Sequence, residues 1–192
     1  MADLLTNAQL VLADRVVTGS IRLDGAQIAA VEPEATLAVP GEDLEGDFLL
    51  PGLIDLHTDN IERHFRPRPR VTWPFPIGSV LTHDWELLGA GITTVVDSLA
   101  LGDYDGDGAR AAMLDGAISS LKAARDAGLL KAEHYLHLRC ELADPGVLEF
   151  ARGRLADPTV RLISLMDHTP GQRQWRNLDI YREYYRKKHA RV

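Results

Sequence analysis

Short β-prone segments alternate with turn signals over the first 48 residues. The turn dipeptide Asp24-Gly25 lies between two of these segments, and Pro33, Pro40 and Gly46 mark a connector after them. The expected strands cover residues 8–13, 15–17, 20–23 and 27–31. This pattern predicts a small N-terminal β lobe, a β-sandwich portion, over residues 1–48.

From residue 48 onward, apolar β-prone runs alternate with segments of helical periodicity. Strands are expected at 48–56, 92–96, 133–142 and 160–166, and helices at 79–89, 109–127, 147–152 and 176–189. Alternation of this kind predicts a parallel sheet of the α/β class. Four or five βα units match half of a (β/α)8 barrel, so residues 49–192 are predicted to be the N-terminal half of such a barrel. The alternative, an open doubly wound sheet, lacks a glycine-rich phosphate loop after its first strand.

Composition and charge argue against nucleic-acid-binding and membrane-spanning proteins. The chain has 192 residues, 45% of them hydrophobic, and a formal net charge of −7. Because its basic residues are scattered, the sequence argues against a general nucleic-acid partner. Cys140 is the single cysteine, which fits a reducing compartment, and no apolar run reaches the roughly 20 residues that span a bilayer. With no signal peptide visible, we expect a cytoplasmic protein without a membrane partner.

The first candidate for chemistry is the segment LPGLIDLHTD at residues 50–59. In a regular strand, alternate side chains share a face, so Asp55, His57 and Asp59 are expected to point the same way. An imidazole nitrogen and a carboxylate oxygen at this spacing can bind one divalent ion. Barrel active sites assemble at the C-terminal ends of strands, where this dyad is expected. The alternative is a hydrogen-bonded surface or core histidine.

A second polar cluster lies in the segment HLRCE at residues 137–141. Alternation places His137, Arg139 and Glu141 on one face of an otherwise buried strand, which is costly unless these groups are paired or bind metal. Glu141, nearest the strand's C-terminal end, is the candidate metal-bridging carboxylate. The alternative is an internal Arg139–Glu141 salt bridge.

A third candidate ligand, His168, follows the strand expected at 160–166, again at the C-terminal end. Its neighbour Asp167 is as well explained by a turn as by a site. Three strand ends that converge on ligand-type residues are stronger evidence than any one of them. For His64, His83, His134 and His189 the sequence indicates no partner, so structural roles are expected for them.

An arginine-rich segment follows the first dyad. Arg63, Arg66, Arg68 and Arg70 lie among the prolines of residues 60–74, and guanidinium groups suit phosphate oxygens. A solvated basic loop is the alternative. Asp103, Asp105 and Asp107 have the spacing of a calcium loop, but Leu114 stands where the closing glutamate would be, so a turn and helix cap are expected instead.

Taken together, these motifs resemble one family. HTDN with the PRP…WP stretch, GITTVVDSLALGD, AEHYLHLRCEL and LISLMDHTPGQRQ are similar to the diphosphatase family of phosphonate catabolism, in the carbon–phosphorus lyase pathway. That family belongs to the amidohydrolase superfamily. The resemblance extends over essentially the whole chain and implies a metal-dependent hydrolase.

The resemblance implies a barrel beside a β-sandwich, a divalent metal, Zn²⁺ or Mn²⁺, and a phosphorylated ribose as the small-molecule substrate. It implies that a ribose 5-triphosphate is hydrolysed to the 5-phosphate and diphosphate. The metal ligands that it implies are His57, Asp59, Glu141 and His168. The candidate substrate-binding residues are Asn60, Arg63, Arg66, Arg68, Arg139, Gln172 and Arg173.

The chain departs from the family in length, because it matches only the N-terminal half. The aspartate that usually accepts the proton is expected beyond residue 192, so no catalytic residue is assigned, and a fragment of this kind is expected to have little or no activity. Open strand edges favour pairing with another chain, so a homo-oligomer is an open alternative. The rival functions are a cyclic-amide or deacetylase-type amidohydrolase and a non-catalytic metal- or partner-binding fragment.

Overall fold

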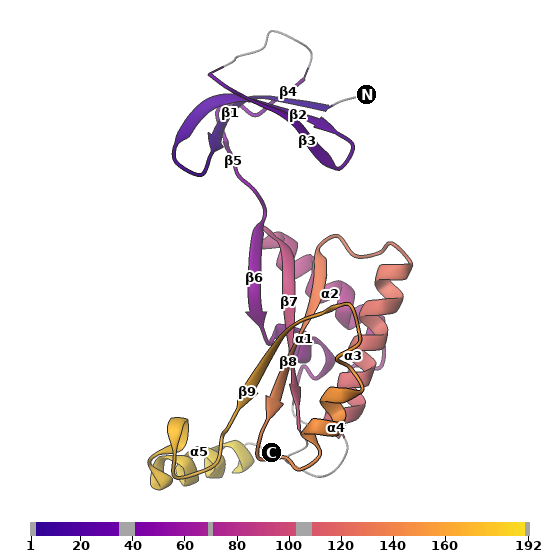
Figure 1. Cartoon of the computed structure of the whole chain (residues 1–192), viewed down its shortest axis with the longest axis vertical. Coiled ribbons are helices and arrows are strands. Elements are labelled where there is room, and N and C mark those ends of the chain that lie inside the picture. The colour runs from indigo at the N-terminus through magenta and orange to yellow at the C-terminus, as the bar shows by residue number, and fades with distance from the viewer. Residues whose placement is uncertain (1–2, 35–40, 69–70, 103–108, 191–192) are drawn as a thin grey trace. The chain divides into compact units, whose positions relative to one another are not determined.

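The chain forms two compact units, Met1–Gly52 and Leu53–Val192 (Figure 1). The computed structural model describes residues 3–34, 41–68, 71–102 and 109–190. Arg70, the calcium-like loop with Asp103, Asp105 and Asp107, and the side chain of His189 lie outside the described residues. No described helix is long and apolar enough to cross a membrane.

The first unit is a small mixed sheet. Strands β1 (Asp3–Val11), β2 (Val16–Asp24) and β3 (Gln27–Pro33) form an antiparallel meander. The short strands β4 (Glu42–Asp43) and β5 (Phe48–Leu49) both pair in parallel with β1. The expected segments 15–17 and 20–23 are one continuous strand, because Thr18 and Gly19 carry the pairing with β1 through the supposed break.

Gly19 stands where β1, β2 and β3 approach each other closely. A Cβ built at this position would lie 2.6 Å from the Glu32 carbonyl oxygen and 2.8 Å from Leu10 Cδ1. Both contacts are shorter than carbon and oxygen atoms tolerate, and the first involves backbone that is held in the ladder. The sheet therefore requires glycine at this point.

We expect Gly19→Ala to destabilise the first unit by about 1–3 kcal/mol, the usual cost of overpacking a filled site. Hydrogen exchange of peptides within residues 3–34, followed by mass spectrometry, should show correspondingly faster exchange. Gly116→Ala is the matched control, because a Cβ in that helix would meet nothing within 4 Å and alanine favours helix. Equal exchange rates in the wild type and the Gly19 variant would contradict the steric argument.

The second unit contains a four-stranded parallel sheet, in the order β6-β7-β8-β9 along the chain (Figure 1). The sequence predicted four or five βα units, and the described residues form four parallel strands. Its elements are β6 (Leu53–Thr58), α1 (Asn60–Phe65), α2 (Pro76–Gly89), β7 (Ile92–Leu101), α3 (Ala109–Asp126), β8 (Glu133–Glu141), α4 (Val147–Arg152), β9 (Val160–Met166), a 3-10 turn (Arg173–Trp175) and α5 (Leu178–Ala190). Sequential parallel strands with helical crossovers are the arrangement of the first part of a (β/α)8 barrel.

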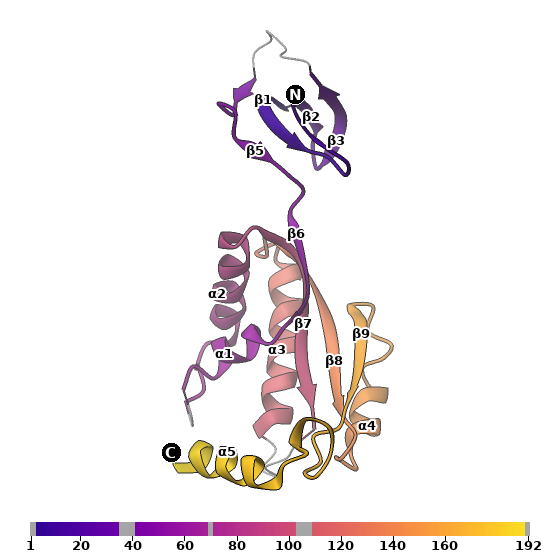
Figure 2. The same cartoon turned by 90° about the vertical axis from the view of Figure 1, so that its left-hand side faces the viewer.

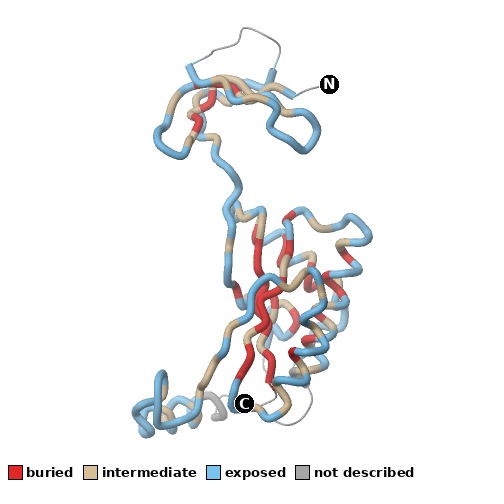
Figure 3. Tube along the Cα trace, in the orientation of Figure 1, coloured by how far each residue is buried: buried red, intermediate tan, exposed pale blue. Residues whose placement is uncertain are grey.

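The core of this unit lies between the central strands and the helices α1, α2 and α3, which cover one face of the sheet (Figure 2). Leu99 and Leu101 of β7 and Leu136 and Leu138 of β8 belong to one buried hydrophobic cluster with Leu121 and Ala124 of α3. Burial follows the strand order, since β7 and β8 are largely buried while β6 and β9 are not (Figure 3). Ile54 and Leu56 on β6 and Leu165 on β9 are each more than 60% exposed.

Helix α1 was not expected, because its residues were interpreted as the start of an arginine-rich loop. Ile61 and Phe65 explain the helix: at a spacing of four residues they share one face, and both are buried in the core cluster. The segment therefore gains burial by coiling, although it is only six residues long. Arg63 lies within this helix and Arg66 directly after it, and both side chains are exposed.

Candidate metal centres

The residues predicted as metal ligands lie where parallel strands end. His57 is the penultimate residue of β6 and Asp59 follows that strand, Glu141 is the last residue of β8, and His168 comes two residues after β9. Because the strands are parallel, their C-terminal ends lie at one edge of the sheet.

The strand β6 is less regular than the sequence suggested. Its pairing register with β7 shifts between Asp55 and Thr58, so strict alternation of Asp55, His57 and Asp59 does not hold. The carboxylate of Asp55 instead accepts a hydrogen bond of 2.9 Å from the backbone N–H of His57. Even so, His57 Nε2 lies 3.7 Å from Asp59 Oδ1, which keeps the two polar groups of the dyad together.

The structure adds His137 to this dyad. His57 Nδ1 and His137 Nδ1 lie 3.1 Å apart, although the two residues are separated by 80 positions. Across the intervening strand β7, Ser98 is the register partner of His137, and its small side chain leaves room on that face. The other ring nitrogen of His137 lies 2.9 Å from the hydroxyl oxygen of Ser164 on β9. Burial, with His57 and Arg139 nearby, lowers the pKa of His137 below its usual value.

Arg139 pairs with the first dyad and not with Glu141, so the alternative of an internal Arg139–Glu141 salt bridge is wrong. Its guanidinium donates to Asp59 Oδ1 at 2.6 Å and to the sulfur of Met166 at 3.2 Å. We call His57, Asp59, His137 and Arg139 the rim cluster.

Glu141 and His168 form a separate pair. The Glu141 carboxylate is fully buried and accepts the backbone N–H of His168 at 3.0 Å, while its second oxygen lies 2.5 Å from His168 Nδ1. A buried carboxylate needs such partners, because an unpaired charge in the core is costly. Glu141 therefore holds His168 in place at the end of β9.

The donor types of the rim cluster suit a divalent metal. Imidazole nitrogens and a carboxylate are donor types that Zn²⁺ and Mn²⁺ accept. His57 faces His137 through Nδ1 and Asp59 through Nε2, on opposite sides of its ring, so rotation of the side chains would be needed to bring the three donors onto one ion. The four predicted ligands do not form one compact group. In the part of the chain that the structure describes, the groups of three or more potential ligands whose donor atoms lie within 4.8 Å of each other are elsewhere.

The candidate substrate-binding residues divide into three sets. Arg139 belongs to the rim cluster, while Arg63, Arg66 and Arg68 are exposed around α1, whose first residue is Asn60. Gln172 donates to Asp167 at 2.9 Å, and Arg173 Nε lies 3.7 Å from the same carboxylate. Asp167 thus organises the turn after β9, where its other oxygen accepts the backbone N–H of Thr169.

A second cluster, buried between the sheet and α2, was not anticipated. His134 Nδ1 and His83 Nε2 each lie 2.7 Å from an oxygen of Asp97, and His134 Nε2 lies 3.2 Å from Asp84. All four side chains are fully buried, and we call them the buried network. Two carboxylate partners raise the pKa of His134 despite the opposing effect of burial.

The sequence held one usable signal for the buried network, the charged residue Asp97 within an apolar strand. In the structure, the strand register puts His134 opposite Val95 and Leu136 opposite Asp97, so His134 and Asp97 share the helix-covered face. A charged residue inside an apolar strand such as Ile92–Leu101 requires a buried partner.

Comparison with known proteins gives a clear relative. No family model matches the chain. It is 41% identical over 187 residues to the alpha-D-ribose 1-methylphosphonate 5-triphosphate diphosphatase of Escherichia coli (strain K12), which covers 97% of this chain and 49% of that protein. The chain therefore spans about half the length of this relative. The match confirms the resemblance inferred from the sequence motifs.

The chain is also similar to solved structures. A D-hydantoinase superposes with a TM-score of 0.50 at 18% identity, covering 85% of this chain and 32% of that chain. The L-hydantoinase (dihydropyrimidinase) of Arthrobacter aurescens has a TM-score of 0.49 at 17% identity, covering 85% of this chain and 36% of that chain. The first likeness confirms the predicted fold class, a partial (β/α)8 barrel preceded by a β lobe.

Proposed function

We propose that this chain, a relative of the ribose methylphosphonate triphosphate diphosphatases, supplies the metal-binding rim of a hydrolase of the amidohydrolase superfamily. The proposed reaction converts a ribose 5-triphosphate derivative to the 5-phosphate and diphosphate, as a step of phosphonate catabolism in the cytoplasm. The bond broken is the anhydride between the first and second phosphates, with water as the other reactant. The supporting observation is that His57, Asp59 and His137 meet at one sheet edge in a chain 41% identical to such an enzyme.

The metal would be held by His57 and Asp59, with Glu141 and His168 as the further ligands that the family resemblance implies. A divalent metal in such a site lowers the pKa of bound water and offsets charge on phosphate oxygens. His137 lies against His57 and extends this donor set. Arg139 holds the Asp59 carboxylate at 2.6 Å and so orients it. Glu141 holds His168 through the two contacts described above.

In the same proposal, the arginines offset the negative charge of the substrate's phosphates. A triphosphate brings several negative charges to the site, and guanidinium groups bind phosphate oxygens through paired hydrogen bonds. Arg63, Arg66 and Arg68 follow the His57–Asp59 dyad directly and have exposed side chains. Asn60, Gln172 and Arg173 are the further candidate contacts. These cationic side chains suit a charged chain of phosphates better than a neutral cyclic amide.

We expect the purified protein, supplied with Zn²⁺ or Mn²⁺, to release diphosphate from the ribose 5-triphosphate at a rate far below that of a full-length relative, because it matches only the N-terminal half of the family, and we expect a chelator to abolish the release. The measurement is diphosphate production over time, with hydantoin ring opening assayed in parallel on the same preparation. Ring opening without diphosphate release would replace the proposal by a cyclic-amide hydrolase. Metal uptake with neither activity would favour a non-catalytic metal-binding role.

A further inference from the structure

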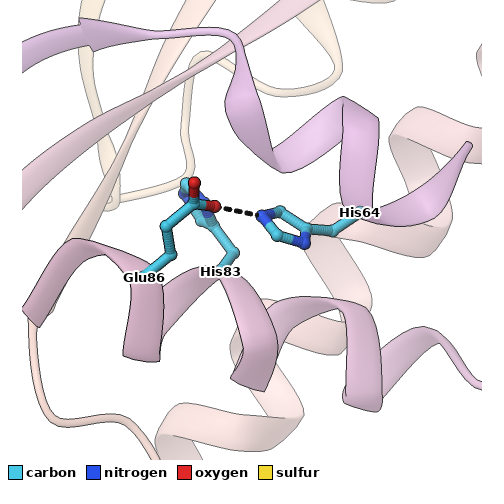
Figure 4. Close-up of side chains that lie close together, drawn as sticks. All are labelled: His64, His83 and Glu86. Carbon is cyan, nitrogen blue, oxygen red and sulfur yellow. Dashed lines mark hydrogen bonds and ion pairs between the residues drawn. The ribbon is translucent and has the colours of Figure 1, made fainter. Parts of the chain in front are cut away.

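We propose that His64, His83 and Glu86 form a second metal site, selective for Zn²⁺, on the helix-covered side of the sheet. The three side chains come from α1 and α2 and lie close together, with His64 facing Glu86 (Figure 4). This site shares no residue with the rim cluster. Its occupant would clamp α1 to α2.

The three donors are nearly in coordination geometry. One ligand atom from each residue lies within 4.8 Å of the others, and His64 Nε2 is 2.8 Å from Glu86 Oε2. Donor atoms around a tetrahedral Zn²⁺ are separated by roughly 3.4 Å, given metal–ligand distances near 2.1 Å. His83 and Glu86 are three residues apart on α2, so they project from one face of that helix. Small side-chain rotations would therefore complete the site.

The strongest evidence for a missing partner is the ring of His83. Its Nε2 lies 2.7 Å from Asp97 Oδ1, whereas its buried Nδ1 has no hydrogen-bond partner among the described residues. An unsatisfied buried polar atom is uncommon in proteins and calls for an explanation. Histidines that bind metals typically donate their second ring N–H to a carboxylate, which leaves the other nitrogen free for the ion. The contact between His83 and Asp97 has this form.

The charges of the buried network favour a cation at this point. Two buried carboxylates, Asp84 and Asp97, face one imidazole that both contact, His134. Asp84 gains further hydrogen bonds from the backbone N–H groups of Lys131 and Ala132, but these bring no formal charge. The two carboxylates therefore bring negative charge close to His83, which a divalent ion bound to His83 would offset.

The donor types and exposure indicate which ion binds. Two imidazoles and one carboxylate suit Zn²⁺ better than Mg²⁺ or Ca²⁺, which prefer oxygen ligands. Glu86 is 59% exposed and His64 20% exposed, so water can occupy a fourth position. The alternative is that no ion binds here and that His64 and Glu86 form a simple surface ion pair.

The test replaces the two more exposed ligands, because His83 is buried against Asp97 and its replacement would disturb the fold. His64→Gln and Glu86→Gln are made singly and together, with Glu149→Gln as the control for loss of an exposed helical carboxylate. Asp59→Asn is also made, alone and combined with the double variant, to remove a proposed ligand of the rim cluster. Each protein is dialysed against Zn²⁺ alone, its zinc content is measured, and its folded state is checked by circular dichroism.

We expect the His64/Glu86 double variant to bind one zinc ion per chain fewer than the wild type and the Glu149→Gln control. The same loss should appear in the Asp59→Asn background, because the two sites are separate. Zinc at about 100-fold above its Kd should raise Tm by roughly 5–10 °C in the wild type, and by less in the double variant. Unchanged zinc content and an unchanged Tm shift in the double variant would overturn the proposal, as would a wild type that binds no zinc outside the rim cluster.

Discussion

Replacing Asp59 by asparagine is expected to slow metal-dependent diphosphate release by roughly 10²–10⁴-fold, since a catalytic metal contributes several kcal/mol to the transition state. The substitution keeps the shape of the side chain but removes the charge that faces both Arg139 and His57. Asparagine is a weak ligand, and it leaves the Arg139 guanidinium without the carboxylate at 2.6 Å. The proposed ligand pair would then lose affinity for the metal and the orientation of its remaining donor.

The measurement is kcat and KM for diphosphate release at saturating Zn²⁺ or Mn²⁺, with metal content determined on the same sample. Asp126→Asn is the matched control, because this aspartate is 62% exposed, pairs with the exposed Lys122, and lies on α3. Folding should be preserved in both variants, since exposed ion pairs contribute at most about 1 kcal/mol. An Asp59→Asn protein that turns over at the wild-type rate would remove this aspartate from the proposed site.

Replacing Asp97 by asparagine is expected to lower the free energy of unfolding of the second unit by about 3–5 kcal/mol, the usual cost of removing one partner from a buried ion pair. Asp97 is fully buried and contacts two histidines at 2.7 Å each. Hydrogen bonds from these histidines lower its pKa although burial opposes the change, so the carboxylate is charged in the folded protein. The variant would leave His134 with Asp84 as its one charged partner.

The chain offers a clean readout for this prediction. All three tryptophans, Trp73, Trp85 and Trp175, lie in the second unit, so urea unfolding followed by tryptophan fluorescence reports that unit alone. Asp126→Asn again serves as the control and should shift the free energy of unfolding by less than about 1 kcal/mol. A similarly small shift for Asp97→Asn would show that the buried network contributes little to stability.

Local signals in the sequence predicted most of the second unit. The helix at 147–152 and the strand at 160–166 have the predicted bounds, because apolar periodicity and β-branched runs are properties of neighbouring residues. The N-terminal lobe followed from turn dipeptides in the same way. Helix α1 was missed because six residues give too short a window for periodicity, and only burial of Ile61 and Phe65 against distant strands makes it helical.

The sequence also determined which strand ends carry ligand-type residues, since parallel strands place their C-terminal ends at one edge. Only the tertiary structure decided which of these residues meet. Arg139 pairs with Asp59 rather than Glu141, and His137 joins His57, over separations of 80 positions. The buried network links α2, β7 and β8 over separations of up to 50 positions. Spacing along the chain gives the face on which a side chain lies, whereas register, crossover and helix packing determine which distant face lies opposite.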